Sequence, residues 1–150
     1  MIELPFDLVP LATVRVTRGD VHRLGTTAFH RRVIGGISRG RWEGERMRAD
    51  IVEPGGDWAI PSTDGSLMLL DVRQTLQTDD GALIFVTYQG RCDRGRGTYT
   101  VAPTFEPRQT SSRWPNRPKP VTSVTACTPS MTDSVAPGVL SWVVLATISR

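Results

Sequence analysis

Residues 70–88 read LDVRQTLQTDDGALIFVTY, a pattern that predicts a β-hairpin. Polar and apolar residues alternate along 70–78, and the partner run over 82–88 is rich in β-branched and aromatic residues. The runs are joined by Asp79-Asp80-Gly81, where glycine can take the left-handed backbone that such a turn requires. This hairpin is the most secure element of the chain.

Turn signals on both sides of the hairpin extend the β pattern. Asp64-Gly65 is a strong hairpin signal between the apolar runs 57–60 and 66–70, and Pro54-Gly55-Gly56 is expected to stop a strand that covers 41–52. Further strands are expected over 11–17, 99–101 and 139–145. About eight strands with no convincing helix predict an all-β fold. A single closed antiparallel barrel is the natural way for such a sheet to remove its edges.

Length and composition suit one domain over residues 1–150. The chain is 39% apolar and holds 14 Gly and 11 Pro, which favours many turns over long helices. Residues 107–150 form a Pro/Ser/Thr-rich C-terminal segment, with six of the eleven prolines and thirteen Ser or Thr. Prolines at 115, 118 and 120 exclude both a helix and a central strand from that part of the segment.

The charge distribution argues against a nucleic-acid partner. Residues 1–106 carry 13 basic and 14 acidic side chains, whereas residues 107–150 carry five basic and one acidic, so the basic balance comes from the C-terminal segment. The arginines between residues 31 and 48 are interleaved with Glu43, Glu45 and Asp50, which largely cancels their field. No nucleic-acid-binding motif accompanies them.

Cysteine usage and the N-terminal residues predict a cytoplasmic protein. Cys92 and Cys127 lie 35 positions apart without paired spacing, so two free thiols are expected rather than a disulfide or a zinc ribbon. Residues 1–7 lack a basic region, and two acidic residues interrupt their apolar run, so no secretory signal is expected. The apolar run 135–148 is interrupted and too short to span a bilayer, so no membrane contact is expected.

Three motifs that suggest chemistry have simpler interpretations. Gly36-Ile37-Ser38-Arg39-Gly40 matches the G-x-S-x-G nucleophile elbow, but both histidines precede Ser38 and no helix follows, so a glycine bend between strands is favoured. His22 and His30 lie eight residues apart in a polar stretch and are expected to be surface residues rather than metal ligands. No phosphate-binding loop or dinucleotide fingerprint is present, and no cofactor is expected.

The strand over 70–78 leaves two orientations open. Asp71, Arg73, Thr75 and Gln77 share one face, and Leu70, Val72 and Leu76 share the other. If the apolar set points inward, which is the favoured orientation, Arg73 is solvated. If the polar set points inward, Arg73 is a buried cation that needs a carboxylate partner such as Asp57, Asp71 or Asp79.

Several segments together resemble the mainly bacterial and fungal domain-of-unknown-function family 3237. The most specific are Pro54-Gly55-Gly56-Asp57-Trp58, a P-G-G-D-W turn, and Thr78 to Ile84, within a T-x-D-G-A-x-I pattern. The sequences at 103–106 (PTFE) and 114–117 (WPNR) are similar to later landmarks of the family, with Pro115 in place of a leucine. The resemblance runs from about Leu11 to Val121 and does not include the last residues, which look diverged.

The resemblance implies a β-barrel similar to the lipocalin-like and allene-oxide-cyclase-like barrels, with no established activity. Barrels of that shape often hold small apolar molecules, and some catalyse cofactor-free cyclisation or isomerisation. This analogy from other barrels to the function of this chain rests on fold alone. Barrels with exposed edges often associate, so a homo-oligomer is plausible, although no residue argues for it.

Two functions therefore stay open at this point. In the first, the barrel binds a small apolar or carbonyl-containing organic molecule and could act as an isomerase, cyclase or lyase. Its catalytic residues would be Asp57 or Asp79 as base and Arg73 as the stabiliser of negative charge. Its ligand-binding residues would be Trp58, Tyr88, Trp114 and Asn116. In the second, the barrel is a non-catalytic ligand-binding, interaction or structural protein.

Overall fold

The computed structural model describes residues 6–107, 125–127 and 139–149, which form one antiparallel β-sheet. The strands are β1 (Phe6–Thr26), β2 (Arg31–Glu43), β3 (Arg48–Pro61), β4 (Leu67–Thr78), β5 (Leu83–Asp93), β6 (Thr98–Pro107), β7 (Thr125–Cys127) and β8 (Val139–Ser149). The described residues contain no helix long and apolar enough to cross a membrane.

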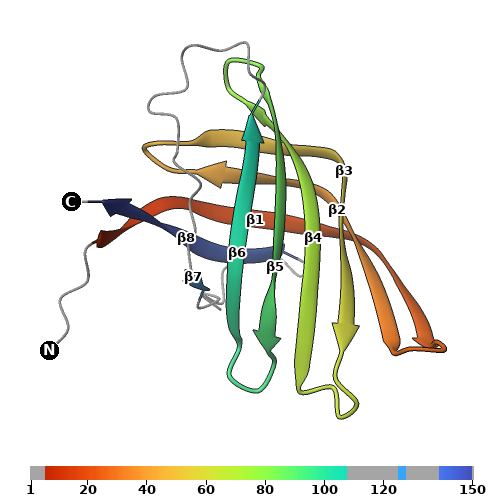
Figure 1. The fold of residues 1–150 in the computed structure, drawn as a ribbon. Coiled ribbons are helices and arrows are strands. Elements are labelled where there is room, and N and C mark those ends of the chain that lie inside the picture. Colours follow the sequence, from red (N-terminus) through yellow and green to blue (C-terminus); the bar gives the residue numbers. More distant parts are fainter. Residues whose placement is uncertain (1–5, 108–124, 128–138, 150) are drawn as a thin grey trace, which may run out of the picture.

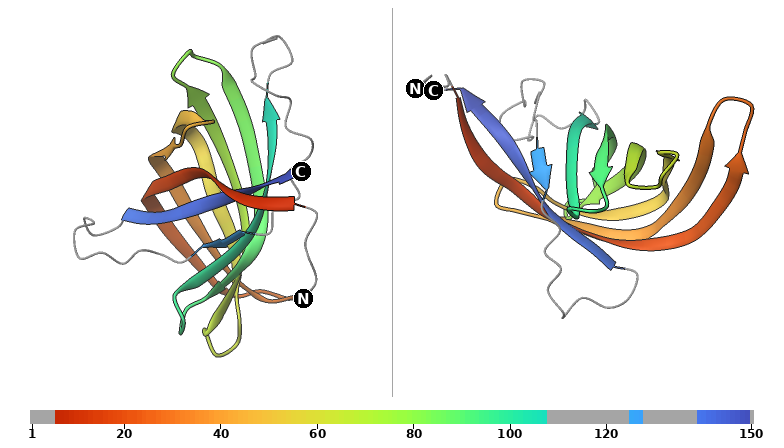
Figure 2. Two further views of the ribbon diagram at one scale, coloured as in Figure 1. Left: turned by 90° about the vertical axis from the view of Figure 1, so that its left-hand side faces the viewer. Right: turned by 90° about the horizontal axis from the view of Figure 1, so that it is seen from below.

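The strand order is β7-β6-β5-β4-β3-β2-β1-β8, so β1 to β6 form a meander of consecutive hairpins (Figure 1). The last strand, β8, returns to pair with the first half of β1 from Phe6 to Thr17. Among the described residues the second half of β1 pairs with β2 and with no other strand, so it is an edge of the sheet there, while β2 goes on to pair with β3 (Figure 2).

The sheet is strongly curved (Figure 2). Its two end strands, β7 and β8, approach within 8 Å between Cα atoms, but no hydrogen-bonded ladder joins them among the described residues. The all-β antiparallel fold is therefore as predicted, whereas closure into a barrel stays a prediction.

Both predicted hairpin turns are present. Gly65 and Gly81 have φ angles of 75° and 86°, the left-handed region that favours glycine. The Asp64 carboxylate accepts hydrogen bonds from Ser62 Oγ at 2.6 Å and Ser66 Oγ at 2.8 Å, which lowers the pKa of Asp64 to about 2. Serine and aspartate thus fix the local geometry of the β3–β4 turn.

The single strand predicted over 41–52 is wrong, because a hairpin turn lies in its middle. Gly44 N donates to Met47 O at 2.8 Å, and the chain reverses between β2 and β3 there. A Cβ on Gly44 would lie 2.0 Å from Leu11 O, so the turn packs too closely on β1 for any larger residue. The glycine marks the turn rather than a position within a strand.

The stop predicted at Pro54-Gly55-Gly56 is also wrong, because β3 continues through it as a bulge. Val52 pairs with Thr75 and Gly56 pairs with Arg73, so residues 53–55 stand opposite the single residue Gln74. Two extra residues preserve the alternation, and side chains therefore face the same sides of the sheet before and after the bulge.

One face of the sheet, called the inner face below, carries the hydrophobic core. Along β4 it presents Leu70, Val72 and Leu76, the apolar set of the predicted strand. Trp42 on β2 meets Phe105 on β6 edge-to-face, with ring centroids 5.6 Å apart at 84°. Since three strands separate β2 from β6 in the sheet, this contact crosses the hollow of the curve.

We expect Gly40→Ala to lower the free energy of unfolding by about 1–3 kcal/mol, the usual cost of overpacking. A Cβ at Gly40 would lie 2.2 Å from Arg15 O and 2.7 Å from Ile51 Cδ1, so the backbone must shift. Gly35→Ala is the matched control, because a Cβ there has no heavy atom within 4 Å, and it should change stability by less than about 0.5 kcal/mol. Urea unfolding of both variants measures the difference, and equal losses would contradict the tight β1–β2 packing.

Candidate functional site

Asp57 lies on the inner face of the sheet. It pairs with the buried Val72 on β4 and with Gly35 on β2, and residues directly opposite each other in a ladder project to the same side. The carboxyl is therefore half-buried at the edge of the hydrophobic core. Of the predicted catalytic residues, Asp57 is the one that faces inward.

The Asp57 carboxylate accepts a hydrogen bond from a backbone N–H in a part of β4 that is not paired with β3. Its Oδ1 accepts from the Asp71 backbone N–H at 3.0 Å, in the part of the β3–β4 ladder where 58–59 and 70–71 are not paired. Burial raises the pKa of the Asp57 carboxyl above its usual range, and the Asp71 N–H offsets part of that rise. A carboxyl with a raised pKa in a partly apolar site is a stronger base than a solvated one.

Open space adjoins Asp57 on the inner face. Gly35 is its cross-strand neighbour, and a Cβ added at Gly35 would meet no heavy atom within 4 Å. On the far side of Gly35, the next residue of this cross-strand row is Val21, which is 40% exposed. The row is therefore packed on the Val72 side of Asp57 and open on the Gly35 side.

A buried polar cluster lies on the same face. Gln74 is completely buried, and its Oε1 accepts from Trp42 Nε1 at 3.0 Å while its Nε2 donates to the Tyr88 hydroxyl oxygen at 3.2 Å. Both ends of the amide are thus satisfied, as burial requires. The cluster fixes the orientation of the Tyr88 phenol.

Tyr88 and Asp57 belong to one row across the inner face. Tyr88 pairs with Val72, which in turn pairs with Asp57, so two strand spacings separate them. This corresponds to roughly 10 Å between Cα atoms. The buried Val72 lies between the two side chains, so the hydrophobic core fills this part of the row.

Cys92 and Tyr99 form a second inner-face pair, on β5 and β6. Cys92 is a buried free thiol, as predicted, and lies opposite Tyr99 in the ladder. Burial, and then the hydrogen bond with Cys92, raises the pKa of Tyr99 to about 12. Tyr99 is therefore a neutral packing partner of Cys92 at physiological pH. The side chain of Cys127 lies outside the described residues.

Arg73 and Trp58 lie on the opposite, outer face. Arg73 Cζ is 4.9 Å from the Trp58 ring centroid, and its Nη2 lies 3.3 Å from Asp71 Oδ2. The favoured orientation, with the apolar set inward and Arg73 solvated, is the one observed. The structure thus separates Arg73 and Trp58 from Asp57, on either side of the same sheet.

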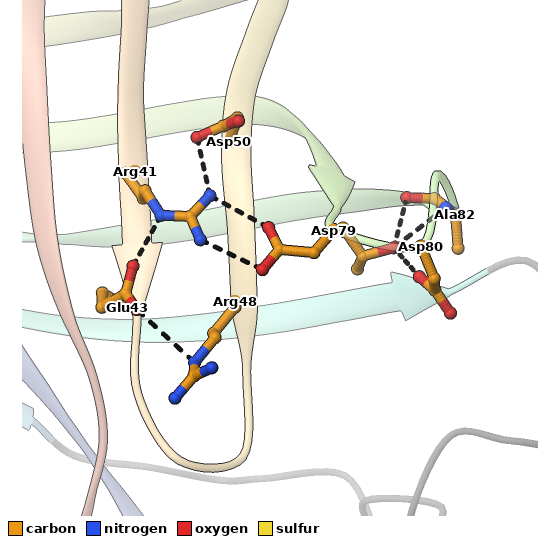
Figure 3. A network of polar contacts seen from close by, with 8 residues as sticks. Arg41, Glu43, Arg48, Asp50, Asp79, Asp80 and Ala82 are labelled. Atoms are coloured by element: carbon orange, nitrogen blue, oxygen red, sulfur yellow. Dashed lines mark hydrogen bonds and ion pairs between the residues drawn. The ribbon is translucent and has the colours of Figure 1, made fainter.

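Asp79 belongs to an exposed ion cluster on the surface (Figure 3). The Arg41 guanidinium contacts Asp79 through two nitrogens, Nη1 to Oδ1 at 3.0 Å and Nη2 to Oδ2 at 3.2 Å, and also pairs with Asp50 and Glu43. The cluster ties the β4–β5 turn to β2 and β3. It places Asp79 in a structural role, away from Asp57.

The other sequence candidates do not join the inner site. Ser38 lies in β2 and donates to Thr17 O at 3.3 Å, without the strand-to-helix turn of a nucleophile elbow. His30 Nε2 lies 2.6 Å from Arg32 Nη2, and no group of three metal-ligating residues occurs among the described residues. Trp114 and Asn116 lie outside the described residues.

Sequence reasoning missed Gln74 and Gly35. Gln74 shares its parity with Leu70, Val72 and Leu76, so a polar residue in the inward set was the available signal. Gly35 was not singled out as a site residue in the sequence, whereas its missing side chain leaves the space beside Asp57 open.

The comparison with protein families agrees with the resemblance seen in the sequence. Residues 6–128 match the family described as protein of unknown function, DUF3237. The chain belongs to the DUF3237 family. A search of curated proteins found no match.

Solved structures share the fold of this DUF3237 chain over its whole length. A beta-barrel like protein from Acinetobacter baumannii is 24% identical, with a TM-score of 0.73 over 98% of this chain and 99% of that one. A conserved protein of unknown function from Rhodopseudomonas palustris is 18% identical, with a TM-score of 0.73 over 97% and 100%. An enzyme from Penicillium herquei is 19% identical, with a TM-score of 0.68 over 99% and 98%.

We expect Arg73→Ala to lower the free energy of unfolding by no more than about 1 kcal/mol, because exposed ion pairs and cation–π contacts contribute little. The guanidinium lies on the outer face and is 47% exposed. Chemical denaturation measures the effect. A loss of several kcal/mol would mean that Arg73 is a buried partner after all.

Asp57→Asn should be at least as stable as the wild type at pH 7. The raised pKa of Asp57 means that the folded state disfavours the ionised form, while an Asn Oδ1 can still accept from the Asp71 N–H. As the pH falls from 7 towards about 4, the wild type binds its proton and should gain stability relative to the variant. Melting temperatures of both proteins across this range test the sign. A wild type that loses stability faster than the variant on acidification would point to a cation that holds Asp57 ionised.

Proposed function

We propose that this protein binds a small carbonyl-containing organic molecule on the inner face of a closed β-barrel and isomerises or cyclises it without a cofactor. The observation that carries the proposal is Asp57, a half-buried carboxyl with a raised pKa that faces open space beside Gly35. Its one hydrogen bond among the described residues occupies Oδ1, which leaves Oδ2 for a substrate.

Asp57 is the proton carrier of the proposed reaction. Its carboxylate removes a proton from the carbon next to the substrate carbonyl, and the electron pair moves onto the carbonyl oxygen as an enolate. A proton then returns from Asp57 to a carbon or oxygen of the substrate, and in deuterated buffer it can first exchange with solvent. Such a step is balanced without an oxidant or a metal, and a carboxyl with a raised pKa suits it.

The relatives support a fold that can carry catalysis. One structure of the same fold, from Penicillium herquei, is described as an enzyme, and another is described as beta-barrel like. At 19% and 24% identity they support the architecture, so the residues of the reaction are argued from this chain alone.

Asp57→Asn should reduce solvent deuterium exchange at the α-carbon of a bound ketone by at least about 100-fold, the usual contribution of a general base. The probes are a panel of cyclic and aryl ketones in deuterated buffer, followed by proton NMR with wild type, Asp57→Asn and Asp79→Asn. The exchange should persist in Asp79→Asn, because Asp79 is held by Arg41 on the surface. Loss in Asp79→Asn alone would move the base to the β4–β5 turn.

A second variant separates binding from chemistry. Gly35→Leu fills the open space beside Asp57 and keeps the carboxyl in the chain, so it should abolish ketone binding while the melting temperature changes little. Exchange that survives in Gly35→Leu would mean that the substrate lies elsewhere. No exchange with any ketone in the wild type, together with a bound molecule in native mass spectrometry, would favour a non-catalytic binding protein.

A further inference from the structure

The outer face carries a groove that is independent of the inner site. It has a volume of about 520 Å³ and lies over β2 to β5, where the ladder between 58–59 and 70–71 is interrupted. It is lined by Arg32, Trp58, Ile60, Leu69, Asp71 and Arg91. Neither the proposed reaction nor the core uses these side chains.

The floor of the groove is apolar. Ile60 and Leu69 are paired across β3 and β4, and Leu69 remains 48% exposed. The Trp58 ring forms one side and packs over Gly56, where a Cβ would lie 3.3 Å from the ring. An indole ring next to exposed aliphatic side chains suits a flat apolar ligand.

Cations stand at both ends of this floor. Arg91 is opposite Leu69 on β5, and its guanidinium makes no ion pair or hydrogen bond with another described residue. At the other end, Arg32 donates from Nη1 to Trp58 O at 2.7 Å and lies against His30, which holds its guanidinium in place. Arg91 is therefore the cation available to a ligand.

The free donors of the groove suit a single carboxylate. Asp71 also lines the groove, and Arg73 pairs with it at 3.3 Å, so these two charges cancel. Arg32 keeps its positive charge, but two of its nitrogens are engaged by the Trp58 carbonyl and by His30. The guanidinium of Arg91 is the free one among the described lining residues, and a carboxylate matches its fork in charge and geometry.

We propose that this outer groove binds a planar aromatic carboxylate, with its ring against Trp58 and Leu69 and its carboxylate on Arg91. The site does not depend on the proposed reaction, because it lies on the opposite side of the sheet from Asp57. The protein would then bind two classes of ligand, a neutral carbonyl compound on the inner face and an aromatic acid on the outer face.

The test is an NMR titration with 2-naphthoate that follows the indole N–H signals of the intact protein. We expect saturable binding that shifts the Trp58 signal and is weakened about tenfold or more in Arg91→Ala, the loss of one charged hydrogen-bonding group. Arg96→Ala is the matched control, since Arg96 is 83% exposed in the β5–β6 turn and should leave binding unchanged. Equal loss in both variants, or no saturation, would overturn the site.

Two further probes and one variant sharpen the result. Neutral 2-naphthalenemethanol should bind at least about tenfold more weakly than 2-naphthoate, because it lacks the charge for Arg91. Tighter binding of 2-naphthyl phosphate would overturn the assignment to a monoanion. Gly35→Leu should retain naphthoate binding, because Gly35 lies on the inner face. Loss in that variant would place the acid in the inner site.

Discussion

The contacts of Trp42 depend on the curvature of the whole sheet. Its indole donates to Gln74 on β4 and meets Phe105 on β6 edge-to-face, although three strands lie between β2 and β6. These contacts are formed only when the sheet bends until distant strands face each other. The bend buries the inner face, and burial in turn produces the raised pKa of Asp57. The hydrophobic core and the candidate chemistry therefore have one cause.

The alternation of side chains divides the polar residues of this chain into two groups with different properties. Arg73, Asp71 and Trp58 remain on the outer face, where water screens their charges and their contacts stabilise the fold little. Asp57 and Gln74 are on the inner face, where a polar group must find a partner or shift its pKa. Residues that are close neighbours in the sequence thus have different chemistry, and the sheet separates the two proposed ligand sites.

Much of the fold could be predicted from the sequence, because the hairpins at Asp64-Gly65 and Asp79-Asp80-Gly81 are specified by local turn chemistry. The strand predicted over 41–52 and the stop predicted at 54–56 were wrong, because a glycine in the sequence can mark either a turn or a bulge. Gly44 lies in a turn that packs on the Leu11 carbonyl, and Gly55 belongs to a bulge because β4 pairs on both sides of it. The site was predicted in part. Asp57 was named, but its neighbours come from β2 and β4, and their meeting depends on register and curvature that no short pattern encodes.

The pairing of β1 with β8 gives the protein an unfavourable order of synthesis. Residues 6–17 of β1 are synthesised more than 100 residues before their partners at 139–149. Until then one side of β1 has no neighbour, and an unpaired strand edge is a template for wrong partners. Contacts between residues this distant in sequence also form slowly, because a long loop loses conformational entropy before the contacts can stabilise the fold. A nascent chain of this protein should therefore depend on chaperones more than a helical protein of the same length.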